Sequence, residues 1–118
     1  MATHNEFGKA AEEMAVNYLR EKGYEILHRN WKYSRYEIDI IAKKDDLLRI
    51  IEVKSRQSNE AHFPEENVSK NKFRFLTRAA EEFLEQNKEY KDLRFEVLSI
   101  ISHPTREPEF LLIEDVWL

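Results

Sequence analysis

Hydrophobic residues recur at helical spacing in two stretches of the chain. In the first, over residues 6–22, apolar positions fall three and four residues apart and end at Gly23. This pattern predicts an amphipathic helix with a glycine at its C-terminal end. Its apolar positions are Phe7, Ala11, Met14, Ala15, Tyr18 and Leu19. The second stretch predicts a longer helix over residues 69–87. Its inward face would consist of Leu76, Ala79, Ala80, Phe83 and Leu84.

Runs rich in aliphatic and aromatic residues predict five strands around these helices. Three precede the second helix and two follow it, over residues 24–31, 37–42, 47–55, 94–101 and 110–113. The polar residues Lys43 to Asp46 indicate a hairpin connection, and residues 57–67, which include Pro64, indicate an exposed loop. The order α-β-β-β-α-β-β predicts an α/β domain with a mixed sheet flanked by helices. The second helix would cross over between the third and fourth strands in a right-handed connection, which makes these strands parallel.

Strand alternation predicts which acids of the second and third strands share a face. Successive side chains point to opposite faces, so Glu52 and Lys54 share one face of their strand, as Glu37 and Asp39 do on theirs. If the hairpin loop has two or four residues, odd positions of the second strand oppose even positions of the third. Asp39 then lies on the same face as Glu52 and Lys54, whereas an odd loop without a bulge would separate them.

Two carboxylates on one sheet face repel each other unless a cation lies between them, and Mg²⁺ or Mn²⁺ prefers such oxygen ligands. The sequence therefore predicts a metal site made of Asp39, Glu52 and the backbone carbonyl of Val53. Lys54 would orient or help to deprotonate an attacking water. An exposed ion pair between Glu52 and Lys54 is the competing interpretation. The isoleucines that flank both acids favour the metal site, because a buried charge without a partner is costly.

Composition limits the classes of protein that fit this pattern. With 118 residues and few glycines or prolines, the chain is expected to form one domain over residues 1–118. It contains no cysteine, which excludes disulfides, thiolate catalysis and cysteine-based zinc sites. Its sequence has neither an apolar run of the ~20 residues that span a bilayer nor the pattern of a secretion signal. A cytoplasmic location without membrane association is therefore expected.

The net charge of −4 argues against a generic nucleic-acid binder, but positive charge is locally concentrated. Lys70, Arg74 and Arg78 recur every four residues and would form a stripe on the second predicted helix. A solvated helix face is the competing interpretation of this stripe. Cations and aromatic rings are mixed over residues 29–36, as on surfaces that stack bases, although Trp31 is expected to belong to the core. The candidate nucleic-acid contacts are Arg35, Arg56, Lys70, Lys72 and Arg74.

Several motifs together point to a known family. The central ones are E-I-D-I-I-A, which contains Asp39, and E-V-K-S-R, which begins thirteen residues later at Glu52. Further matching positions are Gly8 and Glu12, Gly23-Tyr24, Arg29-Asn30-Trp31, Phe63 with Pro64, and Arg94-Phe95-Glu96-Val97. This set resembles the YraN family, which is similar to archaeal Holliday junction resolvases within the PD-(D/E)xK, or restriction-endonuclease-like, nuclease superfamily. The likeness covers nearly the whole chain.

The resemblance implies a restriction-endonuclease-like fold and a metal-dependent endonuclease that hydrolyses DNA phosphodiester bonds, with branched or junction DNA as a candidate substrate. By position it implies that Asp39 and Glu52 bind the metal and that Lys54 is the catalytic lysine. Glu12 matches a helix glutamate that resolvase-like members add to the site, and Glu37 is the alternative extra acid. Because junction resolution requires two symmetric cuts, the resemblance also makes a homodimer a candidate assembly.

Two positions depart from the family pattern, and other functions stay open. Tyr36 stands where the family often has glycine, so the turn before E-I-D is expected to differ. Glu96 replaces a commoner aspartate and is expected to matter for structure more than for catalysis. The alternative function is a non-catalytic nucleic-acid-binding or protein-interaction module on a nuclease fold. An RNA nuclease is a third candidate.

Overall fold

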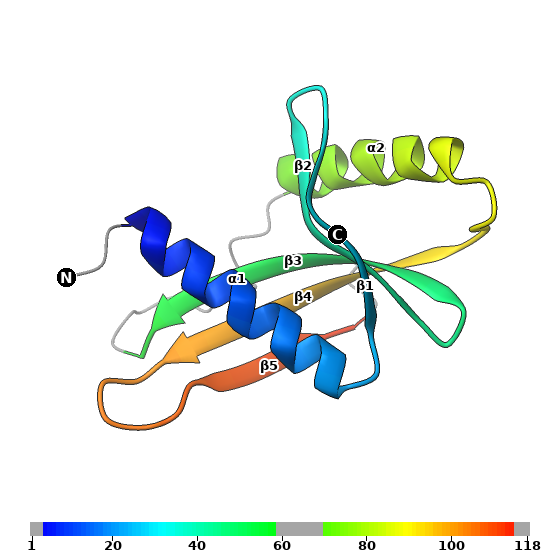
Figure 1. Cartoon of the computed structure of the whole chain (residues 1–118). Coiled ribbons are helices and arrows are strands. Elements are labelled where there is room, and N and C mark those ends of the chain that lie inside the picture. Colours follow the sequence, from blue (N-terminus) through cyan, green and yellow to red (C-terminus); the bar gives the residue numbers. More distant parts are fainter. Residues whose placement is uncertain (1–3, 59–69, 115–118) are drawn as a thin grey trace.

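The helices and strands follow one another in the predicted order. The computed structural model describes residues 4–58 and 70–114 of the chain. Its elements are α1 (His4–Glu21), β1 (Glu25–Tyr33), β2 (Tyr36–Lys44), β3 (Leu47–Gln57), α2 (Lys70–Gln86), β4 (Leu93–Ser102) and β5 (Glu109–Ile113) (Figure 1). Each boundary lies within two residues of its predicted place. The predicted loop 57–67 falls outside the described residues except for Gln57, which ends β3, and Ser58, and both of these are exposed.

The strands form one mixed sheet in the order β1-β2-β3-β4-β5. β3 and β4 are parallel, and the other neighbouring pairs are antiparallel. This pairing confirms the prediction that the third and fourth strands are parallel. A parallel pair needs a long connection, and α2 lies in the connection between β3 and β4. β3, which carries Glu52 and Lys54, is therefore the middle strand of the five.

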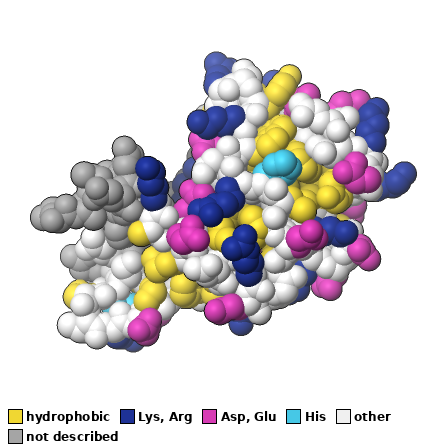
Figure 2. Space-filling model, viewed as in Figure 1, with side chains coloured by type: hydrophobic (Ala, Val, Ile, Leu, Met, Phe, Trp, Pro, Cys, Tyr) yellow, Lys and Arg dark blue, Asp and Glu magenta, His cyan; other side chains and the backbone are white. Residues whose placement is uncertain are grey.

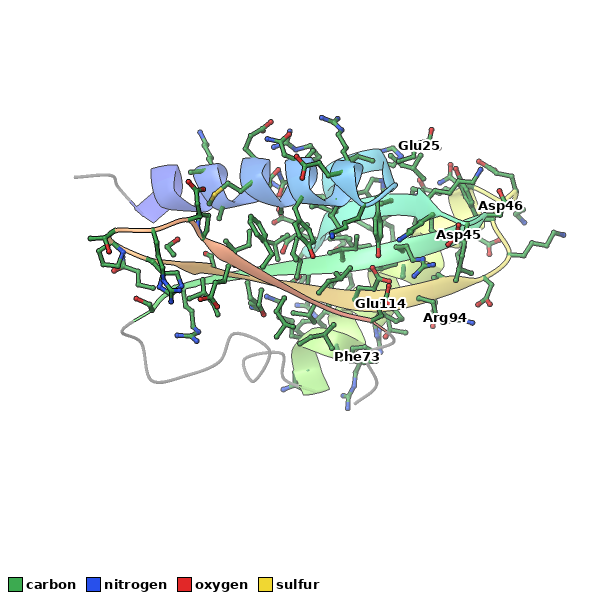
Figure 3. All side chains as sticks on the ribbon, turned by 90° about the horizontal axis from the view of Figure 1, so that it is seen from below. Glu25, Asp45, Asp46, Phe73, Arg94 and Glu114 are labelled. Carbon is green, nitrogen blue, oxygen red and sulfur yellow. The ribbon has the colours of Figure 1, made fainter. Side chains whose placement is uncertain are left out.

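The two helices cover opposite faces of the sheet, with α1 above it and α2 below it in Figure 3. The buried side chains of α1 are Ala11, Ala15, Val16 and Leu19. They pack against β2, β3 and β4, whereas α2 packs against a second cluster formed with β2 and β3. The buried side chains of α2 are Leu76, Ala79, Ala80 and Phe83. Trp31 meets Phe83 edge-on, with ring centroids 5.4 Å apart; it is half-buried and packs against this second cluster, where sequence placed it in the core.

The turn between β2 and β3 has an even number of residues, which is the condition for Asp39 to share a face with Glu52 and Lys54. β2 ends at Lys44 and β3 begins at Leu47, which leaves Asp45 and Asp46 as a two-residue loop. Both have positive φ angles, 55° and 61°, as the two central residues of a type I′ hairpin turn require. Aspartate tolerates this left-handed conformation better than most residues. The even loop length places odd positions of β2 opposite even positions of β3.

A buried polar network lies within the sheet. The Arg49 guanidinium donates to Glu96 at 2.7 Å, and the Tyr24 hydroxyl donates to the other oxygen of that carboxylate at 2.8 Å. Glu96 is 1% exposed, and its ion pair with Arg49 compensates its charge inside the protein. Burial, followed by the hydrogen bond to Glu96, raises the pKa of Tyr24 far above its usual range.

The described surface has mixed charge. Figure 2 shows acidic and basic side chains interspersed over one face of the molecule, with hydrophobic side chains exposed between them. In the described ranges, neither helix combines the length and apolar character needed to cross a membrane.

Candidate active site

The register of β2 and β3 places Asp39 and Glu52 beside each other. The antiparallel ladder ends with Ile40 opposite Ile51, and just beyond it the side chains of Asp39 and Glu52 interact with each other. Both acids line the same cavity, which is bounded on its other side by α2. The two-residue turn thus brings the acids together as the strand alternation predicts. Their role as metal ligands stays a prediction.

Asp39 also bonds the backbone of β3. The Val53 N–H donates to Oδ2 of Asp39 at 2.9 Å. Because the N–H and C=O of a strand residue point toward the same neighbouring strand, the Val53 carbonyl is directed to the side on which Asp39 lies. The role of this carbonyl as a third metal ligand stays a prediction.

Two lysine ammonium groups compensate the charge of Glu52, which is only 4% exposed. Lys54 Nζ lies 3.4 Å from Glu52 Oε1, and Lys72, from the first turn of α2, forms an ion pair with the same oxygen. Sequence reasoning placed Lys72 only among the nucleic-acid contacts. No local sequence pattern predicts its pairing with Glu52, because the two residues meet only when α2 packs on the sheet.

Burial and mutual charge shift the pKa values in this cluster. Burial, followed by the negative charge of Glu52, raises the pKa of Asp39 to about 7, and the hydrogen bond from Val53 opposes this rise. Burial and the neighbouring Lys72 lower the pKa of Lys54. Although burial acts against its charged form, hydrogen bonds with Glu52 and Lys54 raise the pKa of Lys72. Lys72 therefore keeps its positive charge, and Lys54 is the better proton acceptor of the two lysines.

The cavity beside the acids has a volume of about 410 Å³, which lies within the ~300–1,000 Å³ of typical ligand sites. Its walls come from the β1–β2 turn, from β2 and β3, and from the first two turns of α2. The lining residues are Arg35, Tyr36, Glu37, Asp39, Glu52, Asn71, Lys72, Phe75 and Leu76. Acidic, basic and aromatic side chains therefore face one space.

The donor set fits a hard divalent cation that keeps several waters. Within residues 4–58 and 70–114, no group of three or more His, Asp or Glu side chains converges. The site would therefore supply two carboxylates and one carbonyl, which suits Mg²⁺ or Mn²⁺ and not a closed zinc site. The raised pKa of Asp39, caused first by burial and then by the negative charge of Glu52, is compatible with this fit, because a bound cation would offset both effects.

The two candidates for an additional acid lie in different places. Glu37 is exposed and lines the cavity with Asp39. The Glu12 carboxylate accepts hydrogen bonds from Arg29 at 3.0 Å and Asn30 at 2.9 Å, and its helix covers the face of the sheet opposite to α2. Glu37 therefore shares the cavity with Asp39, and Glu12 forms an ion pair with β1; the role of either residue as an extra acid stays a prediction.

The predicted nucleic-acid contacts are only partly brought together. Arg35 and Lys72 line the cavity. Arg74 is exposed on α2, and Arg56 is half-buried near the end of β3. The side chain of Lys70 lies outside the described part of the chain. Of the predicted contacts that the structure describes, two therefore bring positive charge to the cavity: Arg35 from the β1–β2 turn and Lys72 from α2.

Comparison with known proteins matches most of the chain to one family. The family described as "Uncharacterised protein family UPF0102" matches residues 11–100. A UPF0102 protein of Bacteroides thetaiotaomicron is 43% identical over 86% of this chain and 84% of its own length. A UPF0102 protein of Christiangramia forsetii is 41% identical over 87% of each chain, and one of Flavobacterium psychrophilum is 39% identical over 85% of this chain and 84% of its own. The matched residues include both central motifs.

Proposed function

The chain belongs to the UPF0102 family, and we propose that it is a metal-dependent endonuclease that hydrolyses phosphodiester bonds of DNA in the cavity beside Asp39 and Glu52. One observation carries this proposal: two acids from neighbouring strands converge in a largely buried position with Lys54 next to them. A solvated polar face would not bury a carboxylate to 4% exposure. Because buried charges cost stability, a functional reason for the pair is favoured over a structural one.

The metal would be held by the oxygens of Asp39 and Glu52 and by the Val53 carbonyl. When bound, Mg²⁺ or Mn²⁺ would lower the pKa of a coordinated water and offset negative charge on the scissile phosphate. The hydrogen bond from the Val53 N–H fixes one oxygen of Asp39, and a side-chain hydrogen bond links Asp39 to Glu52. The two carboxylates are thus oriented by the sheet before any ligand arrives.

The lysines have separate tasks in this proposal. Lys54, whose pKa is lowered by burial and by Lys72, is the residue that accepts or orients the proton of the attacking water. Lys72 offsets the charge of Glu52 in the free protein. A phosphate that enters the cavity offers this ammonium an alternative partner, so Lys72 can transfer its contact from the protein to the substrate.

The motifs around the site support the finer assignment to the restriction-endonuclease-like, PD-(D/E)xK superfamily. Asp39 in E-I-D and Glu52 with Lys54 in E-V-K correspond to the acid, acid and lysine of that signature. The α-β-β-β-α-β-β order and the mixed sheet flanked by two helices are compatible with it. The resemblance to archaeal Holliday junction resolvases makes branched DNA the first substrate to test and a homodimer the assembly to look for.

A cleavage assay with matched substitutions tests the proposal. The purified chain is incubated with Mn²⁺ or Mg²⁺ and labelled four-way junction, flap and duplex DNA of one sequence. We expect cleavage of at least one substrate, with a loss of at least 100-fold in Asp39→Asn and in Glu52→Gln, because each removes a metal ligand. Glu81→Gln makes the same chemical change at an exposed position of α2 and should cleave like the original chain. Equal cleavage by all three variants would contradict the proposed site.

A non-catalytic nucleic-acid-binding or protein-interaction module is the second candidate, and the Lys72 contact favours it. This ion pair supplies Glu52 with a cation from the protein itself, which a site that never binds metal would also need. DNA binding that is unchanged by chelator and by Asp39→Asn, together with no cleavage, would favour this candidate over the nuclease.

A further inference from the structure

Two aromatic rings lie at the mouth of the acid cavity and face solvent in part. Phe75, on α2, is 43% exposed. Its ring lies 5.3 Å from that of Tyr36, at the start of β2, with 32° between the planes. Both residues line the cavity that contains Asp39 and Glu52. We refer to Tyr36 and Phe75 as the aromatic shelf.

Phe75 lies outside the hydrophobic cluster against which α2 packs, whereas Tyr36 is half-buried and packs against that cluster. The buried side chains of α2 begin with Leu76 and continue with Ala79. Among the described residues, the large hydrophobic side chains that are exposed are Tyr33, Phe75 and Leu111. Of these three, Phe75 lines the cavity, and Tyr33 is the register partner of Tyr36 across the β1–β2 turn. Figure 1 shows this hairpin extending past α2.

Positive charge accompanies the rings. The Arg35 guanidinium lies 5.8 Å from the centre of the Tyr36 ring, and Lys72 stands one helical turn before Phe75 on α2. Arg74 is exposed on the same helix. Aromatic faces with interleaved cations suit a ligand that combines planar rings with phosphates, which is the chemistry of a nucleic-acid strand. An apolar peptide could cover the rings, but it would offer no phosphate to the guanidinium groups of Arg35 and Arg74 beside them.

The geometry points to a binding site for an unpaired nucleobase. We propose that the aromatic shelf stacks a base next to the phosphate that is cut, so that the substrate is DNA with a single-stranded segment at the cleavage position. This inference rests on the proposed nuclease function and makes it more specific. In an intact duplex both faces of an internal base are covered by its neighbours, whereas a flap or frayed end offers a free face to a ring.

The proposal is tested by comparing the affinity of the chain for a flap with its affinity for a blunt duplex of the same sequence. The full chain is titrated in EDTA, without cleavage, and fluorescence anisotropy gives the affinity. A 2-aminopurine at the first unpaired position reports stacking through quenching of its fluorescence. We expect Phe75→Leu to weaken flap binding about 5- to 100-fold, the range of a base–aromatic stack. The same variant should abolish the quenching and leave duplex affinity unchanged. Phe75→Tyr keeps a ring and should retain both signals.

Leu111→Ala is the matched control, because Leu111 is 48% exposed on β5 and belongs to another edge of the sheet. Three results would refute base stacking on the aromatic shelf. They are equal loss of flap and duplex binding in Phe75→Leu, an equal effect of Leu111→Ala, and absence of binding to either DNA. If the nuclease proposal is wrong but the aromatic shelf does stack a base, flap binding and quenching persist and no DNA is cut in Mn²⁺. If only the stacking proposal is wrong, flap and duplex are cut at equal rates and no quenching is observed.

Discussion

Replacing Asp39 by asparagine removes one negative charge from the acid pair and keeps an oxygen that can accept the Val53 hydrogen bond. In the metal-free protein the pKa of Asp39 is about 7, against 3.8 for an unperturbed aspartate. The folded state therefore holds a proton that the unfolded state releases as pH rises above about 4. The cost of ionising Asp39 in the folded protein is absent below that pH, grows between about pH 4 and pH 7, and is constant above.

The pKa difference of roughly 3 units corresponds to about 4 kcal/mol at 1.36 kcal/mol per unit. Partial exposure of Asp39 and the two nearby lysines screen part of this cost, so we expect Asp39→Asn to be more stable than the original chain by about 2 kcal/mol at pH 8. For a domain of this size that corresponds to a Tm increase of roughly 8 °C. At pH 4.5 the two proteins should differ little.

Thermal and urea unfolding from pH 4.5 to pH 8.5, in EDTA, measure this difference. Glu37→Gln is the control, because Glu37 lines the same cavity but is exposed, and its substitution should leave the pH profile unchanged. Addition of Mn²⁺ at pH 8 should stabilise the original chain and not Asp39→Asn, since only the original binds the ion tightly. A stability difference that is the same at every pH would refute the reasoning, because the effect would then not arise from ionisation of Asp39.

Three further substitutions test other contacts. Lys72→Met should tighten Mn²⁺ binding about tenfold, measured by calorimetry, because it removes the ammonium that competes for Glu52; unchanged affinity would show that the contact does not oppose the metal. Lys54→Ala should lower the cleavage rate about 10²- to 10⁴-fold with Mn²⁺ affinity retained, and a parallel loss of both would make Lys54 a positioning residue. Arg49→Ala should lower the free energy of unfolding by about 3–5 kcal/mol, since Glu96 would keep a buried charge without its ion-pair partner; urea unfolding measures this loss, and a loss below 1 kcal/mol would contradict it.

The fold was accessible from sequence because local rules agree along the chain. Apolar spacing predicts both helices, the Asp45–Asp46 turn has the residue type that a two-residue hairpin tolerates, and the length of the α2 connection explains the parallel pair. These features depend on neighbours within a few residues. The convergence of Asp39 with Glu52 was accessible for the same reason, since it follows from the alternation of two strands joined by one short turn.

The contacts that sequence reasoning missed join distant segments. Lys72 reaches Glu52 only because α2 packs across β2 and β3, and Phe75 meets Tyr36 only because the β1–β2 hairpin extends past α2. Neither pair has a characteristic spacing. The ion pair between Glu12 and Arg29 was likewise not predicted, because it forms only when α1 packs beside β1.

The central position of β3 has a consequence for how the protein opens. Over residues 48–51 this strand pairs with both neighbouring strands, so exposing these amides requires separation of β2 from β3 or of β3 from β4. Amide hydrogens at residues 48–51 should therefore exchange with deuterium only through nearly global unfolding. The strand that carries Glu52 and Lys54 thus belongs to the rigid part of the molecule, and accommodation of differently shaped ligands falls to the β1–β2 hairpin at the edge of the sheet.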